Sequence, residues 1–164
     1  MESAKLLARF LISSFIDAYK DQYSAENMET YCSQHYTFEE QEKVLNDSNY
    51  DVFFADKSGS EVGALVIHHH SCPLKPNLNS SELKQLYLLS SEYGTGLAKL
   101  LMEHSFELVK NQGNKWVWLC VSDLNYRAQR FYQKMNFEKI GEGPVLEVGT
   151  ETLPSSIMLR RLNF

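Results

Sequence analysis

A chain of 164 residues with 43% hydrophobic and 23% charged residues has the composition of an ordinary folded protein with one sizeable core. Its net charge of −5 argues against a general nucleic-acid-binding protein, since such proteins usually carry a basic surface. Its unbroken apolar runs fall far short of the roughly 20 residues that a membrane helix needs, and residues 1–20 do not have the form of a secretory signal.

The first third of the chain carries three predicted helices. Apolar residues recur every three or four positions over residues 4–19, which is the spacing of one helical face. A shorter helix is expected over 25–32, after a polar break. A third is expected over 38–46, because Thr37 followed by Glu40 has the form of a capping box. The N-terminal region should therefore be helical, with breaks at its polar segments.

Strand-forming patterns follow these helices. Residues 50–55 are rich in aromatic and β-branched side chains, residues 56–60 are typical of a turn, and residues 62–68 have the pattern of the returning strand. Prolines and a cluster of Asn and Ser residues mark a surface loop over 73–81. Residues 83–89 are predicted to form a further strand, which ends at a glycine-containing turn.

The second half of the chain alternates helices with strands. The strand over 116–121 is almost wholly apolar, as expected for a strand buried on both faces. The order of elements predicts one α/β domain over residues 1–164, with a mixed sheet and helices beside it. The elements predicted here are a helix from Leu97 that ends at Gly113, the strand over 116–121, a helix over 125–135, a strand over 137–141, and a final hairpin of Val145–Val148 with Ile157–Leu159.

A glycine turn joins the strand over 83–89 to the next helix. The two glycines within Tyr93–Ala98 let the backbone turn tightly and approach a ligand closely. The first turn of the helix has amide groups without intrahelical partners, and together with the helix dipole these attract a phosphate. The segment lacks the patterns of a P-loop and of a Rossmann turn. It is therefore either a phosphate-binding turn or a tight connection without a ligand.

This turn resembles that of the GNAT superfamily of N-acetyltransferases. The family carries Arg/Gln-x-x-Gly-x-Gly/Ala, and Gly96 and Ala98 match this motif, whereas Tyr93 replaces the usual Arg or Gln. The replacement puts one pyrophosphate contact in doubt and leaves the backbone contacts. A second family motif, Asn-x-x-Ala-x-x-Phe-Tyr-x-x-x-Gly-Phe, is similar to Asn125–Phe137. Only its glycine differs, and Asn136 in that place can form the same left-handed helix end.

The resemblance implies both a fold and a reaction. The fold would be that of GNAT proteins, with a central mixed, mostly antiparallel sheet flanked by helices. The reaction would be direct transfer of the acetyl group of acetyl-CoA to an amine. The C-terminal stretch is similar to polyamine acetyltransferases of the spermidine/spermine type, so polyamines come first among the expected acceptors. Because dimers are common among similar proteins, a homodimer is a further expectation.

The resemblance also implies which residues bind and react. Tyr132 corresponds to the family's general-acid tyrosine, although its spacing also suits a core position. Asn125 corresponds to a position that hydrogen-bonds the cofactor arm, or it caps the helix. An amide of Leu88 or Leu89 would polarise the thioester carbonyl. The predicted cofactor-binding residues are Leu88, Leu89, Tyr93, Gly94, Thr95, Gly96, Leu97, Ala98, Lys99, Asn125, Ala128 and Lys134.

Two residues are candidates for the general base. Glu82 stands at the start of the strand that should open onto the acceptor site, and Tyr87 lies within that strand. Asp17, Asp21 and Tyr23 follow the first helix, where the family often gathers acceptor-binding residues. A carboxylate there would hold a second positive charge of a polyamine, or it would belong to an ordinary exposed helix end.

The histidines and cysteines are not expected to form a metal site. Consecutive strand residues point to opposite faces, so His68, His69 and His70 cannot converge on one ion. His68 and His70 can share a face, but no nearby Cys, Asp or Glu pattern completes a site. The chain has three cysteines, none in a CxxC pair, which predicts free thiols and a reducing cytoplasm. Cys120 is expected to be buried and inert.

Two other functions remain open at this point. A non-catalytic, acyl-CoA-binding regulatory module would keep the cofactor site without turnover, and the replacement at Tyr93 is compatible with it. A peptide or protein N-acetyltransferase would use the same cofactor on a larger acceptor. The expected partner is a small-molecule amine, and neither a nucleic acid nor a membrane is expected.

Overall fold

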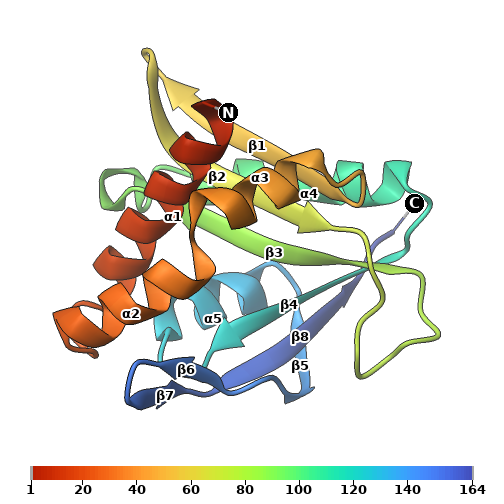
Figure 1. Ribbon diagram of the computed structural model, residues 1–164. Coiled ribbons are helices and arrows are strands. Elements are labelled where there is room, and N and C mark those ends of the chain that lie inside the picture. Colours follow the sequence, from red (N-terminus) through yellow and green to blue (C-terminus); the bar gives the residue numbers. More distant parts are fainter. Residues whose placement is uncertain (1, 164) are drawn as a thin grey trace.

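The computed structural model describes residues 2–163 (Figure 1). Every α-helix, and each of the first five strands, lies where the sequence predicts it, within a few residues at the ends. In chain order the elements are α1 (Glu2–Tyr19), α2 (Ala25–His35), α3 (Phe38–Asn46), β1 (Tyr50–Lys57), β2 (Ser60–His68), β3 (Ser80–Leu88), the short 3-10 helix η1 (Ser90–Glu92), α4 (Leu97–Asn111), β4 (Trp116–Ser122), α5 (Tyr126–Lys134), β5 (Glu138–Glu142), β6 (Leu146–Val148), β7 (Glu151–Leu153) and β8 (Ser155–Arg161).

Side-chain caps define the starts of two N-terminal helices. The Thr37 hydroxyl accepts a hydrogen bond from the Glu40 amide at 3.2 Å, so that α3 begins at the residue that the capping pattern predicts. Ser24 caps α2 in the same way, accepting from the Asn27 amide at 3.2 Å. Each bond satisfies an amide that has no partner within its helix, which explains why local sequence alone predicts these helix starts.

Six strands form one sheet in the order β1-β2-β3-β4-β8-β5, and β6 and β7 form a separate pair. β3 and β4 run parallel, whereas β1–β2, β2–β3, β4–β8 and β5–β8 are antiparallel. The predicted mixed, mostly antiparallel sheet with flanking helices is therefore confirmed.

The parallel strands β3 and β4 pair only at their first residues. Ser80–Glu82 of β3 lie beside Trp116–Trp118 of β4, and the pairing stops there, although β3 continues to Leu88 and β4 to Ser122. Figure 1 shows the two ribbons diverging from that point. The carboxyl ends of two adjacent strands are thus separated in the middle of the sheet, and α/β sheets bind ligands at the carboxyl ends of such strands.

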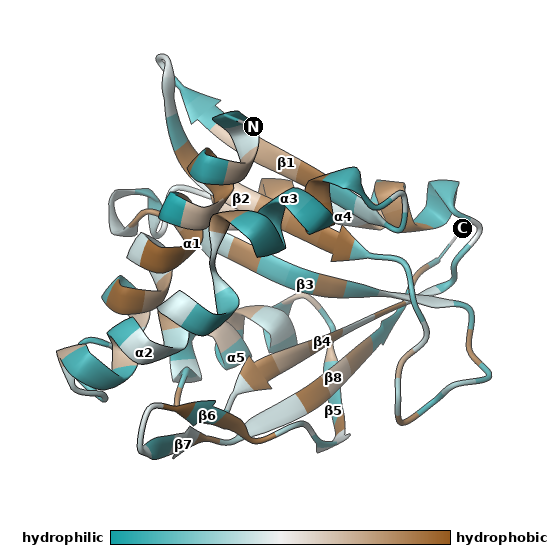
Figure 2. Cartoon of the chain, in the orientation of Figure 1, coloured by the Kyte–Doolittle hydropathy of each residue, from teal (hydrophilic) through white to brown (hydrophobic). Residues whose placement is uncertain are grey.

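Helices cover both faces of the sheet. Ala64 and Val66 of β2 pack in the core beneath α1 and α2, whereas the alternate residues Leu65 and Ile67 pack in the core that contains α4 and α5. This division follows from the two-residue period of a strand. Figure 2 shows the apolar colour concentrated in the central strands, while α3 is mostly hydrophilic.

The predicted C-terminal hairpin is wrong. β6 pairs with β7, not with residues 157–159, because Gly149 at φ 62° turns the chain back directly after Val148. β8 then enters the main sheet between β4 and β5. Since β8 has a neighbour on each side, it has no free edge for strand pairing with a second chain.

Among residues 2–163, no helix has both the length and the apolar character that crossing a membrane requires. Cys32, Cys72 and Cys120 are all free thiols, as predicted. Cys32 and Cys72 are buried, whereas Cys120 is exposed, which corrects the prediction that it is buried.

Candidate active site

A first cavity of about 270 Å³ lies where β3 and β4 diverge. Its walls come from α1, β3, the glycine turn, β4 and α5, so segments far apart in the sequence meet at one place. Of the residues that the sequence predicts for the site, those that line this cavity are Leu88, Tyr93, Gly94, Gly96, Ala98, Asn125, Ala128, Tyr132 and the alternative base Tyr87.

The glycine turn presents free amide groups to this cavity. Gly94 and Gly96 have φ angles of 78° and 92°, and Gly96 stands at the N-terminus of α4 without a side-chain cap. The amides of Gly94, Gly96, Ala98 and Lys99 have no hydrogen-bond partner within the described residues. Unpaired amides at the positive end of a helix dipole form an anion-binding site, and a diphosphate meets this requirement.

A buried carboxylate holds the turn in place. The Thr95 amide and hydroxyl both donate to the Glu92 carbonyl, at 3.3 and 2.8 Å. The Glu92 side chain in turn accepts from Lys57 of β1 at 2.9 Å and is only 8% exposed. Sequence reasoning did not single out Glu92 or Lys57, because their contact joins residues 35 positions apart. Their ion pair links the glycine turn to the hairpin of β1 and β2.

Arg127 brings a positive charge to the cavity beside Tyr93. Its guanidinium carbon lies 3.6 Å from the centre of the Tyr93 ring, and both residues line the first cavity. Tyr93 stands where the family carries Arg or Gln. The guanidinium of Arg127, from α5, therefore lies next to the position of the replaced residue. Sequence reasoning did not single out Arg127, although its place two residues after Asn125 in the second motif was a usable signal.

Tyr132 lies at the junction of the cavity with the core. Its ring stands edge-on to Phe137 at 5.8 Å between centroids, and its hydroxyl has no hydrogen-bond partner in residues 2–163. Burial raises the pKa of Tyr132 well above that of a free tyrosine, so the phenol stays protonated at neutral pH. Tyr132 therefore packs against the core and also lines the first cavity, and its phenol has a proton to donate.

Asn125 caps α5. Its side-chain oxygen accepts a hydrogen bond from the Ala128 amide at 3.1 Å, so Asn125 is the N-cap of α5, one of the two roles expected for it. Asn125 and Ala128 also line the first cavity, so the cap and the cavity wall are built from the same residues.

The amides at the end of β3 differ in availability. The Leu89 amide donates to the Val62 carbonyl of β2 at 3.0 Å, so it faces away from the cavity. Amides alternate in direction along a strand, and the Leu88 amide therefore faces the side from which β4 has separated. Of the two predicted candidates, Leu88 is the one that can donate to a thioester carbonyl.

A second cavity of about 500 Å³ adjoins the first. Tyr19, Tyr87 and Ser122 belong to the walls of both, which makes the two cavities neighbours across the end of α1 and the middle of β3. The wall is rich in aromatic residues and also contains two carboxylates. It includes Phe15, Tyr19, Tyr31, His35, Tyr36, Glu40, Tyr50, Glu82 and Tyr87.

Both candidate bases line the second cavity. Glu82 is mostly buried, with a side chain 13% exposed, and it accepts a hydrogen bond from His70 at 2.8 Å. The Tyr87 hydroxyl lies 3.5 Å from the Tyr36 hydroxyl. Burial raises the pKa of Tyr87 well above that of a free tyrosine, so the phenolate form is disfavoured at neutral pH. Glu82 is therefore the better proton acceptor of the two.

A buried hydroxyl in the wall of the first cavity has no partner. Ser14 of α1 is 7% exposed, and its oxygen makes no hydrogen bond to any described residue. The Phe10 carbonyl, one turn back along the helix, accepts a hydrogen bond from the Ser13 hydroxyl rather than from Ser14. An unpaired buried hydroxyl is costly, so its position beside the cavity is consistent with a ligand that supplies the missing bond.

The acidic residues after the first helix do not contribute to the second cavity. Asp17 forms an exposed ion pair with Lys20 at 2.7 Å, and Asp17 and Asp21 border a surface hollow that shares Tyr93 and Arg127 with the first cavity. Tyr23 is buried, and its hydroxyl donates to the Thr152 carbonyl at 3.1 Å. Of the two alternatives for this group, the contacts of Asp17 fit the ordinary exposed helix end. The carboxylates in the cavity are Glu40 and Glu82.

Several predicted cofactor residues lie outside the cavity wall. Lys99 is exposed and lies 3.7 Å from Glu103 on the surface of α4. Lys134 is exposed near the end of α5. The five predicted residues that do not line the first cavity are Leu89, Thr95, Leu97, Lys99 and Lys134.

Cys120 faces both cavities. Its exposure corrects the sequence prediction, and the reason is that β4 has lost β3 as a neighbour beyond Trp118. Surrounding protein atoms, and then the charge of Glu82, raise the pKa of the Cys120 thiol to about 11. Cys120 is thus accessible but remains a thiol at neutral pH.

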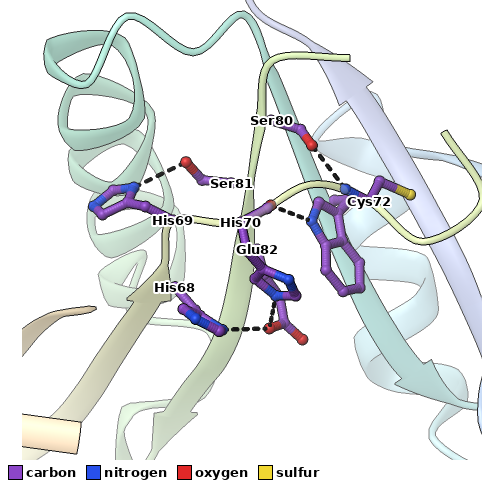
Figure 3. A network of polar contacts seen from close by, with 8 residues as sticks. His68, His69, His70, Cys72, Ser80, Ser81 and Glu82 are labelled. Carbon is purple, nitrogen blue, oxygen red and sulfur yellow. Dashed lines mark hydrogen bonds and ion pairs between the residues drawn. The ribbon is translucent and has the colours of Figure 1, made fainter. Parts of the chain in front are cut away.

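Two histidines and a carboxylate meet at the end of β2. His68 lies opposite Glu82 in the β2–β3 register, and His68 Nδ1 and His70 Nε2 lie 3.6 and 2.8 Å from the same carboxylate oxygen of Glu82 (Figure 3). The prediction that no acidic residue accompanies these histidines is wrong. It failed because Glu82 is 12 residues from His70 in the chain and adjacent to it only through strand pairing.

Comparison with known proteins places the chain in a family. Residues 11–137 match the model of the acetyltransferase (GNAT) family. An uncharacterized N-acetyltransferase of Mycobacterium bovis is 32% identical over 120 residues, which cover 73% of this chain and 72% of that protein. An uncharacterized N-acetyltransferase of Archaeoglobus fulgidus is 26% identical over 100 residues, which cover 61% of this chain and 68% of that protein.

Solved structures share the fold. The PaiA N-acetyltransferase of Thermoplasma acidophilum, determined in complex with coenzyme A, superposes with a TM-score of 0.79 at 19% identity, covering 98% of this chain and 94% of that one. A GCN5-related N-acetyltransferase of Rhodopseudomonas palustris superposes with a TM-score of 0.75 at 20% identity, covering 98% and 91%. With the family match, the diverging strands and the glycine turn, these findings show that the chain belongs to the acetyltransferase (GNAT) family and is an acetyl-CoA-dependent N-acetyltransferase.

Proposed function

We propose that this enzyme acetylates a primary amine of a small molecule, with polyamines as the first class of acceptor. The observation that carries the proposal is the pair of adjoining cavities. The first, beside the glycine turn, suits acetyl-CoA, and the second, with aromatic walls and two carboxylates, suits an amine. Tyr87 and Ser122 belong to both walls, so an acyl group and an amine held in the two cavities would meet there.

The first cavity suits the cofactor in three places. The unpaired amides of Gly94, Gly96, Ala98 and Lys99 would hold the diphosphate. Arg127 would add a charge-assisted contact to a phosphate oxygen beside Tyr93. The Leu88 amide would donate to the thioester carbonyl, where negative charge develops during attack by the amine.

The second cavity suits a cationic acceptor. Tyrosine faces attract ammonium groups, and the Glu82 carboxylate would hold a positive charge. Glu40 already pairs with Lys43, so a second ammonium group would have to compete with that lysine. An acceptor with two amino groups would use both kinds of contact. The aromatic wall also favours a carbon chain between the amines over a strongly polar body.

Acetyl transfer requires a proton acceptor and a proton donor. A primary alkylamine has a pKa near 10.4, so it enters the site protonated and must lose a proton before attack. We assign proton acceptance, directly or through water, to Glu82. It is the carboxylate of the second cavity that lies on β3, and β3 borders both cavities. Tyr132, protonated and lining the first cavity, would donate to the sulfur of the departing coenzyme A.

Release of free thiol from acetyl-CoA tests the acceptor class. The panel should compare diamines and polyamines with monoamines, amino acids and short peptides at equal concentration. Release should be fastest with a diamine or polyamine, because these can meet Glu40 and Glu82 together. Turnover with peptides alone would overturn the small-molecule assignment. Tight binding of acetyl-CoA without release from any amine would favour a non-catalytic acyl-CoA-binding module instead.

We also propose that residues 1–164 act as one catalytic domain in the cytoplasm. The three free cysteines support a reducing compartment. A homodimer is part of the same proposal and is supported by the family resemblance.

A further inference from the structure

His68, His70 and Glu82 form a cluster beside the second cavity (Figure 3). His68 is the last residue of β2, Glu82 lies opposite it on β3, and His70 lies two residues further along the chain. The rings of the two histidines lie with their centroids 3.9 Å apart. One nitrogen of each ring and one oxygen of Glu82 all lie within 4.8 Å of one another. Three possible metal ligands therefore converge from two adjacent strands.

The surrounding residues hold both histidine rings in position. Tyr50 stacks on His68 at 4.0 Å with an interplanar angle of 7°. Trp118 donates from its indole nitrogen to the His70 carbonyl at 3.1 Å, and its ring stands edge-on to His70 at 5.0 Å. The ring positions are thus set by packing, and ligands held in place in advance lose little freedom on binding an ion.

The distances fit a small tetrahedral ion. Zinc bonds to histidine nitrogen and carboxylate oxygen at about 2.0–2.2 Å, so tetrahedral ligand atoms lie about 3.4 Å apart. The distances of 3.6 Å from His68 and 2.8 Å from His70 to Glu82 lie on either side of that value. Side-chain movements of about half an ångström would bring these distances to the tetrahedral spacing. Calcium and magnesium prefer oxygen ligands, so two imidazoles favour a transition metal.

We propose that His68 Nδ1, His70 Nε2 and a carboxylate oxygen of Glu82 bind one divalent transition-metal ion of the zinc type. Three protein ligands leave a fourth position for water or for a group from the second cavity, which Glu82 lines. The ion would neutralise the Glu82 carboxylate and leave a net positive charge at this end of the cavity. A metal-bound Glu82 is a weaker proton acceptor and no longer attracts a cation, so the ion would oppose the role proposed above for Glu82 in acetyl transfer. The inference itself concerns metal binding by the chain and does not depend on that role.

Calorimetric titration of the protein with zinc chloride tests the site. The titration is done without acetyl-CoA, because the thiol of free coenzyme A would itself bind zinc. The wild type should bind one zinc ion per chain. His68→Gln, His70→Gln and Glu82→Gln should each weaken binding by about tenfold or more, since even the loss of an outer-shell partner weakens metal binding by 10–100-fold.

Two matched variants control for other ligands. His104→Gln removes an exposed histidine on α4, and Cys120→Ser removes the exposed thiol. Both should bind zinc as the wild type does. Melting temperatures measured without zinc show whether each variant is folded, and the wild-type titration stands regardless of them. The proposal is overturned if the wild type binds no zinc, or if the folded cluster variants bind zinc as tightly as the wild type.

Discussion

The guanidinium of Arg127 lies over the ring of Tyr93, 3.6 Å from its centre, at the wall of the first cavity. The two residues belong to different elements, and the contact exists because α5 packs against the turn before α4. Tyr93, which replaces the Arg or Gln of the family motif, thus holds the guanidinium of Arg127 beside that position. We expect this pair to contribute to the binding of acetyl-CoA.

Arg127→Met should raise KM for acetyl-CoA by about tenfold and change kcat little. The expected loss corresponds to one hydrogen bond to a charged group, worth about 1.5–3 kcal/mol when buried and less at this exposed position. Steady-state kinetics with varied acetyl-CoA measure it. Arg130→Met, on the exposed side of α5, is the matched control and should retain the wild-type KM. Equal effects of the two substitutions would argue against a specific contact.

Gly96→Ala should weaken cofactor binding beyond its effect on stability. The φ of 92° at Gly96 costs an alanine about 1–2 kcal/mol, and relief of that strain would shift the free amides of the turn, although the added Cβ itself meets open space. Gly113, with φ 76° and open space around it, follows the end of α4 away from the first cavity. Gly113→Ala should therefore lower the melting temperature similarly and leave KM for acetyl-CoA unchanged. A normal KM in Gly96→Ala would contradict the assignment of this turn to the diphosphate.

Tyr132→Phe should lower kcat about 100-fold or more with little change in KM for acetyl-CoA, because it removes a proton donor that acts on the departing thiolate. Its raised pKa keeps the donor protonated, so the wild-type rate should show no alkaline decline from this group up to about pH 10. Tyr126→Phe is the control, since Tyr126 is exposed at the start of α5. An unchanged kcat in Tyr132→Phe would refute its catalytic role.

The folded state should lose stability at alkaline pH. Burial raises the pKa of Tyr36, Tyr87 and Tyr132 above the value of about 10 in the unfolded chain. Their contribution is complete below about pH 10 and is lost as pH rises toward the folded pKa, because the unfolded chain then releases protons that the folded chain retains. Each such tyrosine should reduce the free energy of unfolding by about 1.4 kcal/mol per pH unit in that range.

Urea unfolding between about pH 9 and pH 11 measures this loss. Surface lysines with raised pKa values, such as Lys43, contribute a decline of the same sign. The comparison with Tyr36→Phe isolates one tyrosine, and its stability should fall less steeply with pH than that of the wild type. Parallel pH dependences of the two proteins would show that Tyr36 is not protected from ionisation.

Local patterns in the sequence predicted most of the secondary structure. The helix starts at Thr37 and Asn125 depend on contacts between residues three apart, and the boundaries of α3 and α5 were accordingly close. The positions of strand β4 and of the turn before α4 also follow from local sequence, namely an apolar run and two glycines. The family motifs joined these segments into one expected site, and Tyr132, Asn125 and the turn do line one cavity.

The tertiary structure decided which distant residues meet. The pairing of β2 with β3 placed Glu82 beside His68, the insertion of β8 overturned the expected hairpin, and the direction of α1 turned Asp17 outward. The periodicity of a segment determines which face is buried. It does not determine the neighbour across that face, because pairing energies are similar for many strands and only the packed whole selects among them. The sequence by itself therefore determined the elements and the glycine turn, whereas the packed fold decided the second cavity, the Arg127–Tyr93 contact and the histidine cluster.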